Sequence, residues 1–175
     1  KDLDLIHRAL RYAVYREYIT SNPADSVEKL KEERFEPQPL TVEEMNLLRQ
    51  AVEQSEDWRL IVPVYLGAYQ GLRRGEIVGL KWEMVSFEDN IIRIRETITQ
   101  MGGEIIEKPP KTEESHRDLE IFPSVRDMLL RYRDYQIENN LYNEYVVVNQ
   151  NGTHLNPTFL SKKFKEFIIK NFKWI

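Results

Sequence analysis

Two short stretches of this 175-residue chain carry the side chains best suited to act on a phosphate group. Residues 71–76 read Gly-Leu-Arg-Arg-Gly-Glu and follow an apolar stretch, and residues 110–117 read Pro-Lys-Thr-Glu-Glu-Ser-His-Arg between two strand-like runs. A guanidinium offers a planar fork of donors that matches phosphate oxygens. An ammonium is a mobile charge that can give up a proton once it is desolvated. Each stretch therefore indicates a cation presented at the end of an ordered element.

In the first stretch, Arg73 is the expected phosphate ligand. Gly71 fits the position just past a helix end, so Arg73 stands where a backbone turn can aim it. Glu76 follows three residues later on the same helical face and can hold the arginine in place. Arg74 is the competing candidate. Each stretch also has a plain structural explanation: an arginine after a helix-ending glycine can be a solvated cap, and a Lys-Thr-rich turn can be only a turn.

Taken together and in this order, with residues 80–82 (Leu-Lys-Trp) after the first stretch, the two stretches resemble the tyrosine recombinases, the phage-integrase family. The resemblance implies that Arg73 binds the scissile phosphate, that Glu76 supports it, and that Lys111 protonates the leaving 5′-oxygen of DNA. The family places its catalytic arginine directly after Gly-Leu, which favours Arg73 over Arg74. The further residues expected to contact DNA are Arg74, Lys81, Thr112, Ser115, Arg117, Asn156, Thr158, Lys162 and Lys163, with Thr112, Ser115 and Arg117 as phosphate contacts or stabilisers of their loop.

The family also needs a second box, His-x-x-Arg, and then a tyrosine nucleophile. No tyrosine follows Tyr145 here, and the near match from His7 to Arg11 has the wrong spacing. We therefore expect half of an active site from an integrase of a phage or mobile element, inactive alone. The resemblance implies strand exchange through a 3′-phosphotyrosyl intermediate, which needs no metal or nucleotide cofactor. It also implies double-stranded DNA as the partner and a homo-tetramer on DNA in the intact protein.

The overall charge opposes a simple DNA-binding interpretation. The net charge is −4 and the isoelectric point about 5.5, whereas phosphate binding usually leaves a basic footprint. The acid is concentrated between residues 28 and 57, while five lysines after Gly152 face one glutamate. Binding depends on the field at one face rather than on the total. The plain alternative for the lysines is a solvated helix face.

Composition narrows the class further. No run approaches the ~20 apolar residues of a membrane span, so no membrane contact is expected. The absence of cysteine excludes disulfides and thiolate metal sites and fits a soluble protein of the reducing cytoplasm. No metal site and no small-molecule substrate are expected either, since His7 and His154 have no metal-ligand spacing around them.

The pattern of apolar residues predicts an α+β fold that is mostly helical with a small antiparallel sheet. Thr41 and Glu44 form a capping box at one helix start. Asp57 precedes another helix, and Pro123 suits the first turn of a third. The helices are expected over residues 2–20, 42–54, 58–70, 74–80, 123–140 and 157–171, and the strands over residues 84–87, 91–95, 104–107 and 117–121.

These elements suggest three parts: residues 1–24 as the last helix of a core-binding domain, 25–39 as a linker, and 40–175 as the amino-terminal part of a catalytic domain whose carboxy-terminal part is missing.

Three other interpretations of the function stay open. The chain could be a noncatalytic DNA-binding or regulatory module with the same fold, or a helical interaction domain whose motifs arise by chance. A type IB topoisomerase shares the catalytic logic, but the core-binding-like opening followed by a capping box suits an integrase better.

Overall fold

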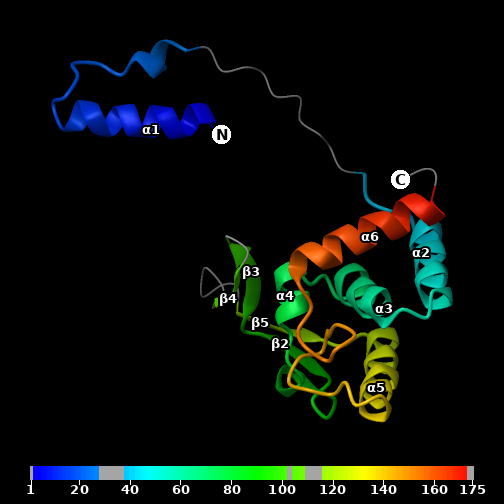
Figure 1. The fold of residues 1–175 in the computed structure, drawn as a ribbon. Coiled ribbons are helices and arrows are strands. Elements are labelled where there is room, and N and C mark those ends of the chain that lie inside the picture. Colours follow the sequence, from blue (N-terminus) through cyan, green and yellow to red (C-terminus); the bar gives the residue numbers. More distant parts are fainter. Residues whose placement is uncertain (1, 28–37, 102–103, 109–115, 173–175) are drawn as a thin grey trace. The chain divides into compact units, whose positions relative to one another are not determined.

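The structure, a computed structural model, describes residues 2–27, 38–101, 104–108 and 116–172 (Figure 1). The chain divides into two compact units between Pro39 and Leu40. The predicted catalytic residue Lys111, and Thr112 and Ser115 beside it, lie outside the described residues, as does most of the expected linker.

The first unit contains helix α1 (Asp2–Tyr15) and the short 3₁₀ helix η1 (Pro23–Ser26). The prediction that α1 continues to residue 20 is wrong, because Glu17 adopts a positive φ of 60° and turns the chain. The apolar residues of α1 are not buried within the unit; Leu5 is 62% exposed. His7, the decoy of the sequence analysis, places its Nε2 2.5 Å from Oδ1 of Asp25. It therefore has a local structural partner.

In the second unit, α2 (Val42–Gln54) begins at the predicted capping box of Thr41. Helix α3 (Trp58–Val64) begins at Asp57 as expected, but the prediction of one regular helix to residue 70 is wrong. From Tyr65 to Tyr69 the chain forms a π-helical turn, η2, in which the N–H of Gln70 donates to the carbonyl of Tyr65. Pro63 has no N–H to donate, which removes a regular bond just before this turn.

Three further helices follow: α4 (Arg74–Gly79), α5 (Pro123–Glu138) and α6 (Pro157–Asn171). Helix α3 packs against α2, α4, α5 and α6, and so lies at the centre of the helical layer (Figure 1). A 3₁₀ turn, η3 (Trp82–Met84), leads from α4 into the strands. Among the described residues, no helix is long and apolar enough to cross a membrane.

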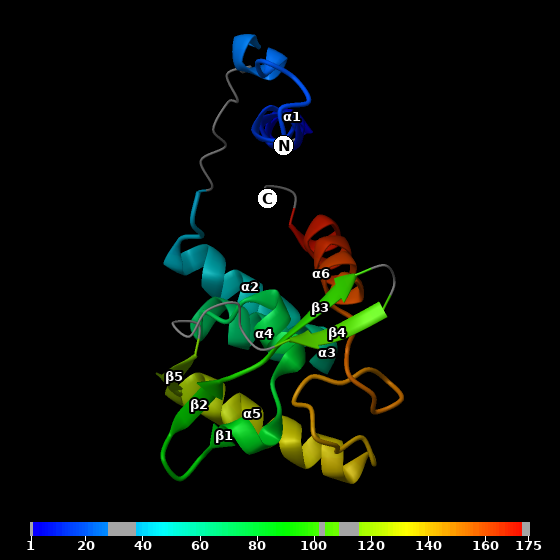
Figure 2. The same cartoon turned by 90° about the vertical axis from the view of Figure 1, so that its left-hand side faces the viewer.

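The strands form two antiparallel sheets. Strands β1 (Val85–Ser86), β2 (Ile91–Ile94) and β5 (Arg117–Glu120) make a three-stranded sheet in the order β1-β2-β5. Strands β3 (Thr97–Met101) and β4 (Glu104–Lys108) make a hairpin that lies beside α4 (Figure 2). The sequence analysis missed β3, and β1 is shorter than the predicted strand over 84–87. The predicted class, mostly helical with a small antiparallel sheet, is confirmed.

The core joins the helices to the three-stranded sheet. Val62 of α3, Val78 of α4, Ile92 of β2 and Val125 of α5 have no exposed surface. The buried polar side chain of Gln136 is satisfied, because its Oε1 accepts from Trp82 Nε1 at 2.9 Å and its Nε2 donates to the Val146 carbonyl at 3.2 Å. Helix α4 is therefore anchored to the packed core through Val78.

Candidate functional site

The turn that ends η2 sets the position of Arg73. Gly71 has a φ of 71°, as expected of the residue past a helix end. Arg73 is the N-cap residue of α4, and its backbone N–H donates to Glu76 Oε2 at 2.8 Å. The Arg73 side chain donates through Nη1 to Glu76 Oε1 at 3.1 Å. The expected contact between these two side chains is therefore present, and Glu76 also satisfies a free N–H of its own helix.

Arg117, from the start of β5, completes the cluster. Its Nη1 lies 2.9 Å from Glu76 Oε1 and its Nη2 lies 2.8 Å from Oε2, which is a bidentate pair. Arg117 is 41 residues away from Glu76 in the sequence. Arg117 is the last residue of the Lys111 stretch and the first of β5, so this contact ties that stretch to helix α4, whose N-cap is Arg73.

The cluster combines one carboxylate with two guanidinium groups. Burial disfavours the ionised form of Glu76, but hydrogen bonds from Arg117 and Arg73 outweigh it and lower the pKa of the carboxyl group. The same bond from Arg117 raises the pKa of its guanidinium. The cluster thus holds two positive charges and one negative charge. Because Glu76 is 6% exposed, Arg117 28% and Arg73 74%, the excess positive charge faces solvent at Arg73.

Two glycines fix the β3–β4 hairpin against α4. A Cβ atom on Gly75 would lie 2.4 Å from Thr97 Oγ1 and 2.8 Å from the Ile98 carbonyl oxygen. A Cβ on Gly79 would lie 3.2 Å from the Ile98 backbone N. The backbone of β3 therefore approaches α4 more closely than a side chain would allow. Sequence analysis missed this contact; the available signal was the spacing of four residues between the glycines, which puts both on one helix face.

Two other predicted DNA contacts near α4 have partners within the protein. Arg74 donates through Nη1 to Ser161 Oγ at 2.8 Å and so joins α4 to α6. Lys81 is 14% exposed, and its Nζ lies 3.2 Å from Glu96 Oε2 and 5.5 Å from the centre of the Tyr145 ring. This is the environment of a structural cation.

The predicted residues of α6 fall into different environments. Asn156 is the N-cap, and its Oδ1 accepts from the backbone N–H groups of Thr158 at 2.8 Å and Phe159 at 3.3 Å. Lys162 is 77% exposed, with Glu166 3.9 Å away. Lys163 is only 21% exposed because its Nζ lies 2.6 Å from Asp57 Oδ2. Lys162 faces solvent, whereas Lys163 is turned inward.

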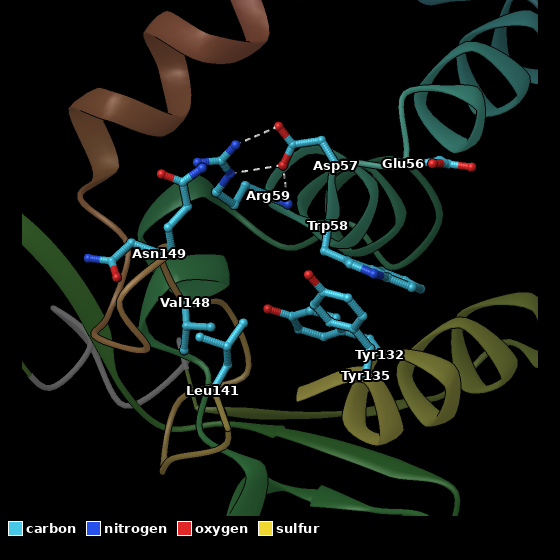
Figure 3. A pocket seen from close by; sticks show the side chains of 10 residues that line it. Glu56, Asp57, Trp58, Arg59, Tyr132, Tyr135, Leu141, Val148 and Asn149 are labelled. Carbon is cyan, nitrogen blue, oxygen red and sulfur yellow. Dashed lines mark hydrogen bonds and ion pairs between the residues drawn. The ribbon is translucent and has the colours of Figure 1, made fainter. Parts of the chain in front are cut away.

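A separate pocket of about 330 Å³ lies at the start of α3 (Figure 3). Trp58, Tyr132 and Tyr135 form one wall, and the Asp57–Arg59 pair forms another. None of Arg73, Glu76 and Arg117 lines this pocket.

Asp57 and Arg59, which both line this pocket, are paired with one another. Asp57 accepts from Arg59 Nε and Nη2, both at 2.9 Å. Burial raises the pKa of Asp57, but the hydrogen bonds from Arg59 and Lys163 outweigh it and lower the value to about 2. Burial raises the pKa of Tyr132 to about 12. Neither group exchanges a proton near neutral pH, and we interpret the Asp57 cluster as a structural clamp.

The sequence model of the phage integrase family matches residues 38–172. The chain therefore belongs to the phage integrase family. Among curated proteins, it is 33% identical over 134 residues to the prophage integrase IntR of Escherichia coli (strain K12). This alignment covers 74% of this chain and 30% of that protein. It is 29% identical over 182 residues to a tyrosine recombinase XerC-like protein of Caldanaerobacter subterraneus subsp. tengcongensis, covering 90% of this chain and 46% of that protein.

Solved structures show the same fold. The Tn1549 transposon integrase in complex with a circular-intermediate DNA superposes with a TM-score of 0.79 at 20% identity, over 99% of this chain and 58% of that one. A lambda integrase tetramer bound to a Holliday junction superposes with a TM-score of 0.70 at 19% identity, over 99% of this chain and 47% of that one. The chain spans less than half the length of the two curated relatives described above.

Proposed function

We propose that the protein is a site-specific DNA recombinase of a phage or other mobile element, which exchanges strands through a 3′-phosphotyrosyl intermediate. Family membership supports this proposal, as do the names of the relatives: a prophage integrase, an integrase of Mycobacterium phage L5 and the ICEBs1 integrase of Bacillus subtilis. The structural neighbours are integrases in complex with DNA. We propose duplex DNA as the partner, tetramer assembly on it, and action in the cytoplasm.

The observation that carries the proposal is the environment of Arg73. Its side chain is 74% exposed, but the guanidinium is bonded to the carboxylate of Glu76, whose side chain is 6% exposed. A guanidinium held in this way meets a phosphate with little reorganisation, which is how preorganised donors stabilise developing charge. In our proposal Arg73 binds the scissile phosphate, Glu76 positions it, and Lys111 protonates the leaving 5′-oxygen. Lys162 and Arg74 are proposed to contact the DNA backbone beside it.

The chemistry divides along the chain in this proposal. The nucleophile of the family is a tyrosine that follows the second box, and no tyrosine follows Tyr145 in this sequence. We therefore propose that the 175-residue chain binds duplex DNA but does not form the covalent adduct.

The first test measures binding of the chain to a fluorescent duplex at several salt concentrations. We expect the affinity to fall as salt rises, with a slope of about −0.9 per phosphate contact in a log–log plot. Arg73→Ala and Lys111→Ala together should reduce the magnitude of that slope by about 2. Arg49→Ala is the matched control, because Arg49 is an ion-paired arginine on α2. Binding that ignores salt, or that survives the double change, would contradict the proposal.

The second test uses a nicked duplex that traps covalent intermediates. We expect the chain to form no covalent protein–DNA adduct that survives denaturation. An adduct formed by this chain would show that our division of the chemistry is wrong.

A further inference from the structure

We propose that Arg117 is a positioning residue that keeps Glu76 from neutralising Arg73. This inference rests on the proposed function, in which Arg73 binds the phosphate. It assigns Arg117 a role that differs from the direct DNA contact expected from the sequence. The argument begins with how the two arginines share one carboxylate.

The two guanidinium groups do not bond to Glu76 equally. Arg117 takes both carboxylate oxygens, at 2.9 Å and 2.8 Å. Arg73 reaches only Oε1 with its side chain, at 3.1 Å. A guanidinium has five N–H donors, so one such bond leaves most of the Arg73 donors for another ligand. The fork of Arg117 is the stronger partner of Glu76.

This unequal sharing decides where the net charge lies. Arg117 and Glu76 form a bidentate pair in which the charges cancel, and the pair is mostly covered by protein. The charge of Arg73 is then left without a full counter-charge in the cluster, at a side chain that is 74% exposed. A phosphate that approaches Arg73 would therefore meet an effective charge near +1.

Loss of Arg117 would reverse this arrangement. A carboxylate as buried as Glu76 is costly to leave without a full partner. Arg73 is the only other side-chain cation bonded to Glu76 among the described residues. Its guanidinium would turn onto both oxygens of Glu76, and the positive charge available to a phosphate would fall.

The backbone of Arg117 is well placed for this role. Arg117 pairs with Ile94 in the β2–β5 ladder, and its carbonyl accepts from Arg95 Nη1 at 3.2 Å. A side chain that starts from a paired strand is located more precisely than one on a loop. The position of Arg117 relative to Glu76 is therefore a property of the sheet.

A double-mutant cycle in DNA binding separates this role from direct contact. We expect Arg117→Ala to reduce the magnitude of the salt slope by about 0.9, as Arg73→Ala does. In the double variant Glu76→Gln/Arg117→Ala the slope should return to the wild-type value, since a neutral amide cannot neutralise Arg73. If Arg117 contacts DNA itself, the double variant should stay as weak as Arg117→Ala. Arg93→Ala, which removes an arginine of β2 paired with Asp89, is the matched control.

A second measurement needs no DNA. Side-chain ¹⁵N relaxation of Arg73 should show a higher order parameter in Arg117→Ala than in the wild type, and a lower one again when Glu76→Gln is added. A merely structural role for Arg117 would leave Arg73 as mobile as before, or more mobile, and would overturn the inference. Should Arg117→Ala fail to fold, Arg117→Lys keeps the charge but loses the fork, and it should raise the order parameter partway.

The two measurements also distinguish the inference from the proposed function. If Arg73 becomes more ordered in Arg117→Ala while Arg73→Ala leaves DNA binding unchanged, the positioning role stands and the assignment of Arg73 to the phosphate fails. If Arg73→Ala weakens binding but the Glu76→Gln rescue is absent, the assignment stands and the positioning role fails.

Discussion

The Asp57 and Glu76 clusters contain the same kinds of groups and differ in whether a cation faces solvent. Each carboxylate lies at the start of a helix, accepts a backbone N–H and binds two cationic side chains. In the Asp57 cluster, Asp57, Arg59 and Lys163 are 19%, 22% and 21% exposed. In the Glu76 cluster the carboxylate is more deeply buried, yet Arg73 is 74% exposed.

This difference shows that the same ion pairing can serve two purposes. The Asp57 cluster joins α3 to α6 and is shielded from solvent by the packing of both helices, so its charges bind one another. The Glu76 cluster joins α4 to β5 and leaves one cation at its edge with a single side-chain bond. We therefore expect changes in the first cluster to affect stability and changes in the second to affect binding.

Truncation of one arginine in each cluster should give the largest contrast. Arg59→Ala removes the bidentate partner of a mostly buried carboxylate. We expect a loss of about 2–3 kcal/mol in the free energy of unfolding, just below the range for fully buried pairs, because the side chains of Arg59 and Asp57 are still 22% and 19% exposed. Arg73→Ala removes an exposed partner while Arg117 stays bound to Glu76, so the loss should be below about 1 kcal/mol. Urea denaturation of both variants measures the contrast. Equal losses in the free energy of unfolding would contradict the distinction between a cluster that stabilises the fold and a cluster that serves binding.

Acid should destabilise the protein through Asp57. The pKa of Asp57 is about 2 in the folded state against 3.8 for the unperturbed group, so its contribution to stability is present above pH 3.8 and is lost as the pH falls through 2. The shift corresponds to about 2 kcal/mol in all, roughly half of it gone at pH 3. Glu76 acts in the same direction, because its pKa is also lowered.

The control for this pH dependence is Asp57→Asn, which removes the titrating group. Urea denaturation at pH 7 and pH 3 should show that the variant loses about 1 kcal/mol less than the wild type between these two conditions. An unchanged loss would assign the acid sensitivity to other carboxylates.

Local signals in the sequence were sufficient to predict much of the fold. The capping box at Thr41, the helix start after Asp57 and the helix-end position of Gly71 were all predicted, because each depends on neighbours within a few residues. The predicted contact between Arg73 and Glu76 has the same origin, since the two residues lie three positions apart at the start of α4.

Contacts between residues that are far apart in the sequence could not be predicted from such local signals. Arg117 was expected to bind DNA or steady its loop, and its pairing with Glu76 depends on how β5 lies against α4. Lys162 and Lys163 are adjacent lysines with the same expected role, yet only the packing of α6 turns Lys163 toward Asp57. Strand β3, which pairs with β4, was missed because polar residues at positions 97, 99 and 100 surround its one central apolar residue, Ile98.

The close approach of β3 to α4 gives a test that should affect the Glu76 cluster and spare the Asp57 cluster. Gly75→Ala places a Cβ atom 2.8 Å from the backbone carbonyl of Ile98, which overpacking values place at about 1–3 kcal/mol. Alanine regains about 0.5–1 kcal/mol in helix propensity, so we expect a net loss of about 1 kcal/mol in the free energy of unfolding. DNA binding should weaken as well, because α4 and the hairpin must separate.

Gly67→Ala is the matched control for that change. Its added Cβ would meet the tip of the Ile77 side chain at 3.4 Å and the Leu72 carbonyl oxygen at 3.9 Å, and both are ordinary van der Waals contacts. Thermal or urea denaturation should therefore show little change. If Gly75→Ala is as stable as Gly67→Ala, the hairpin is not held by the glycine face.

The smallest effects should come from two neighbouring lysines of α6. Lys163→Ala removes one of the two cations on Asp57, but Arg59 remains bound to the carboxylate, so we expect a loss of about 1 kcal/mol in the free energy of unfolding. Lys162→Ala removes a side chain that is 77% exposed and lies 3.9 Å from Glu166, and the stability should change by less than about 0.5 kcal/mol.

In DNA binding the order of the two effects should be the reverse. Lys162→Ala should reduce the magnitude of the salt slope by about 0.9, while Lys163→Ala leaves it unchanged. If the two variants have the same effect on stability and on the salt slope, side-chain exposure does not distinguish lysines that stabilise the fold from lysines that contact DNA in this protein.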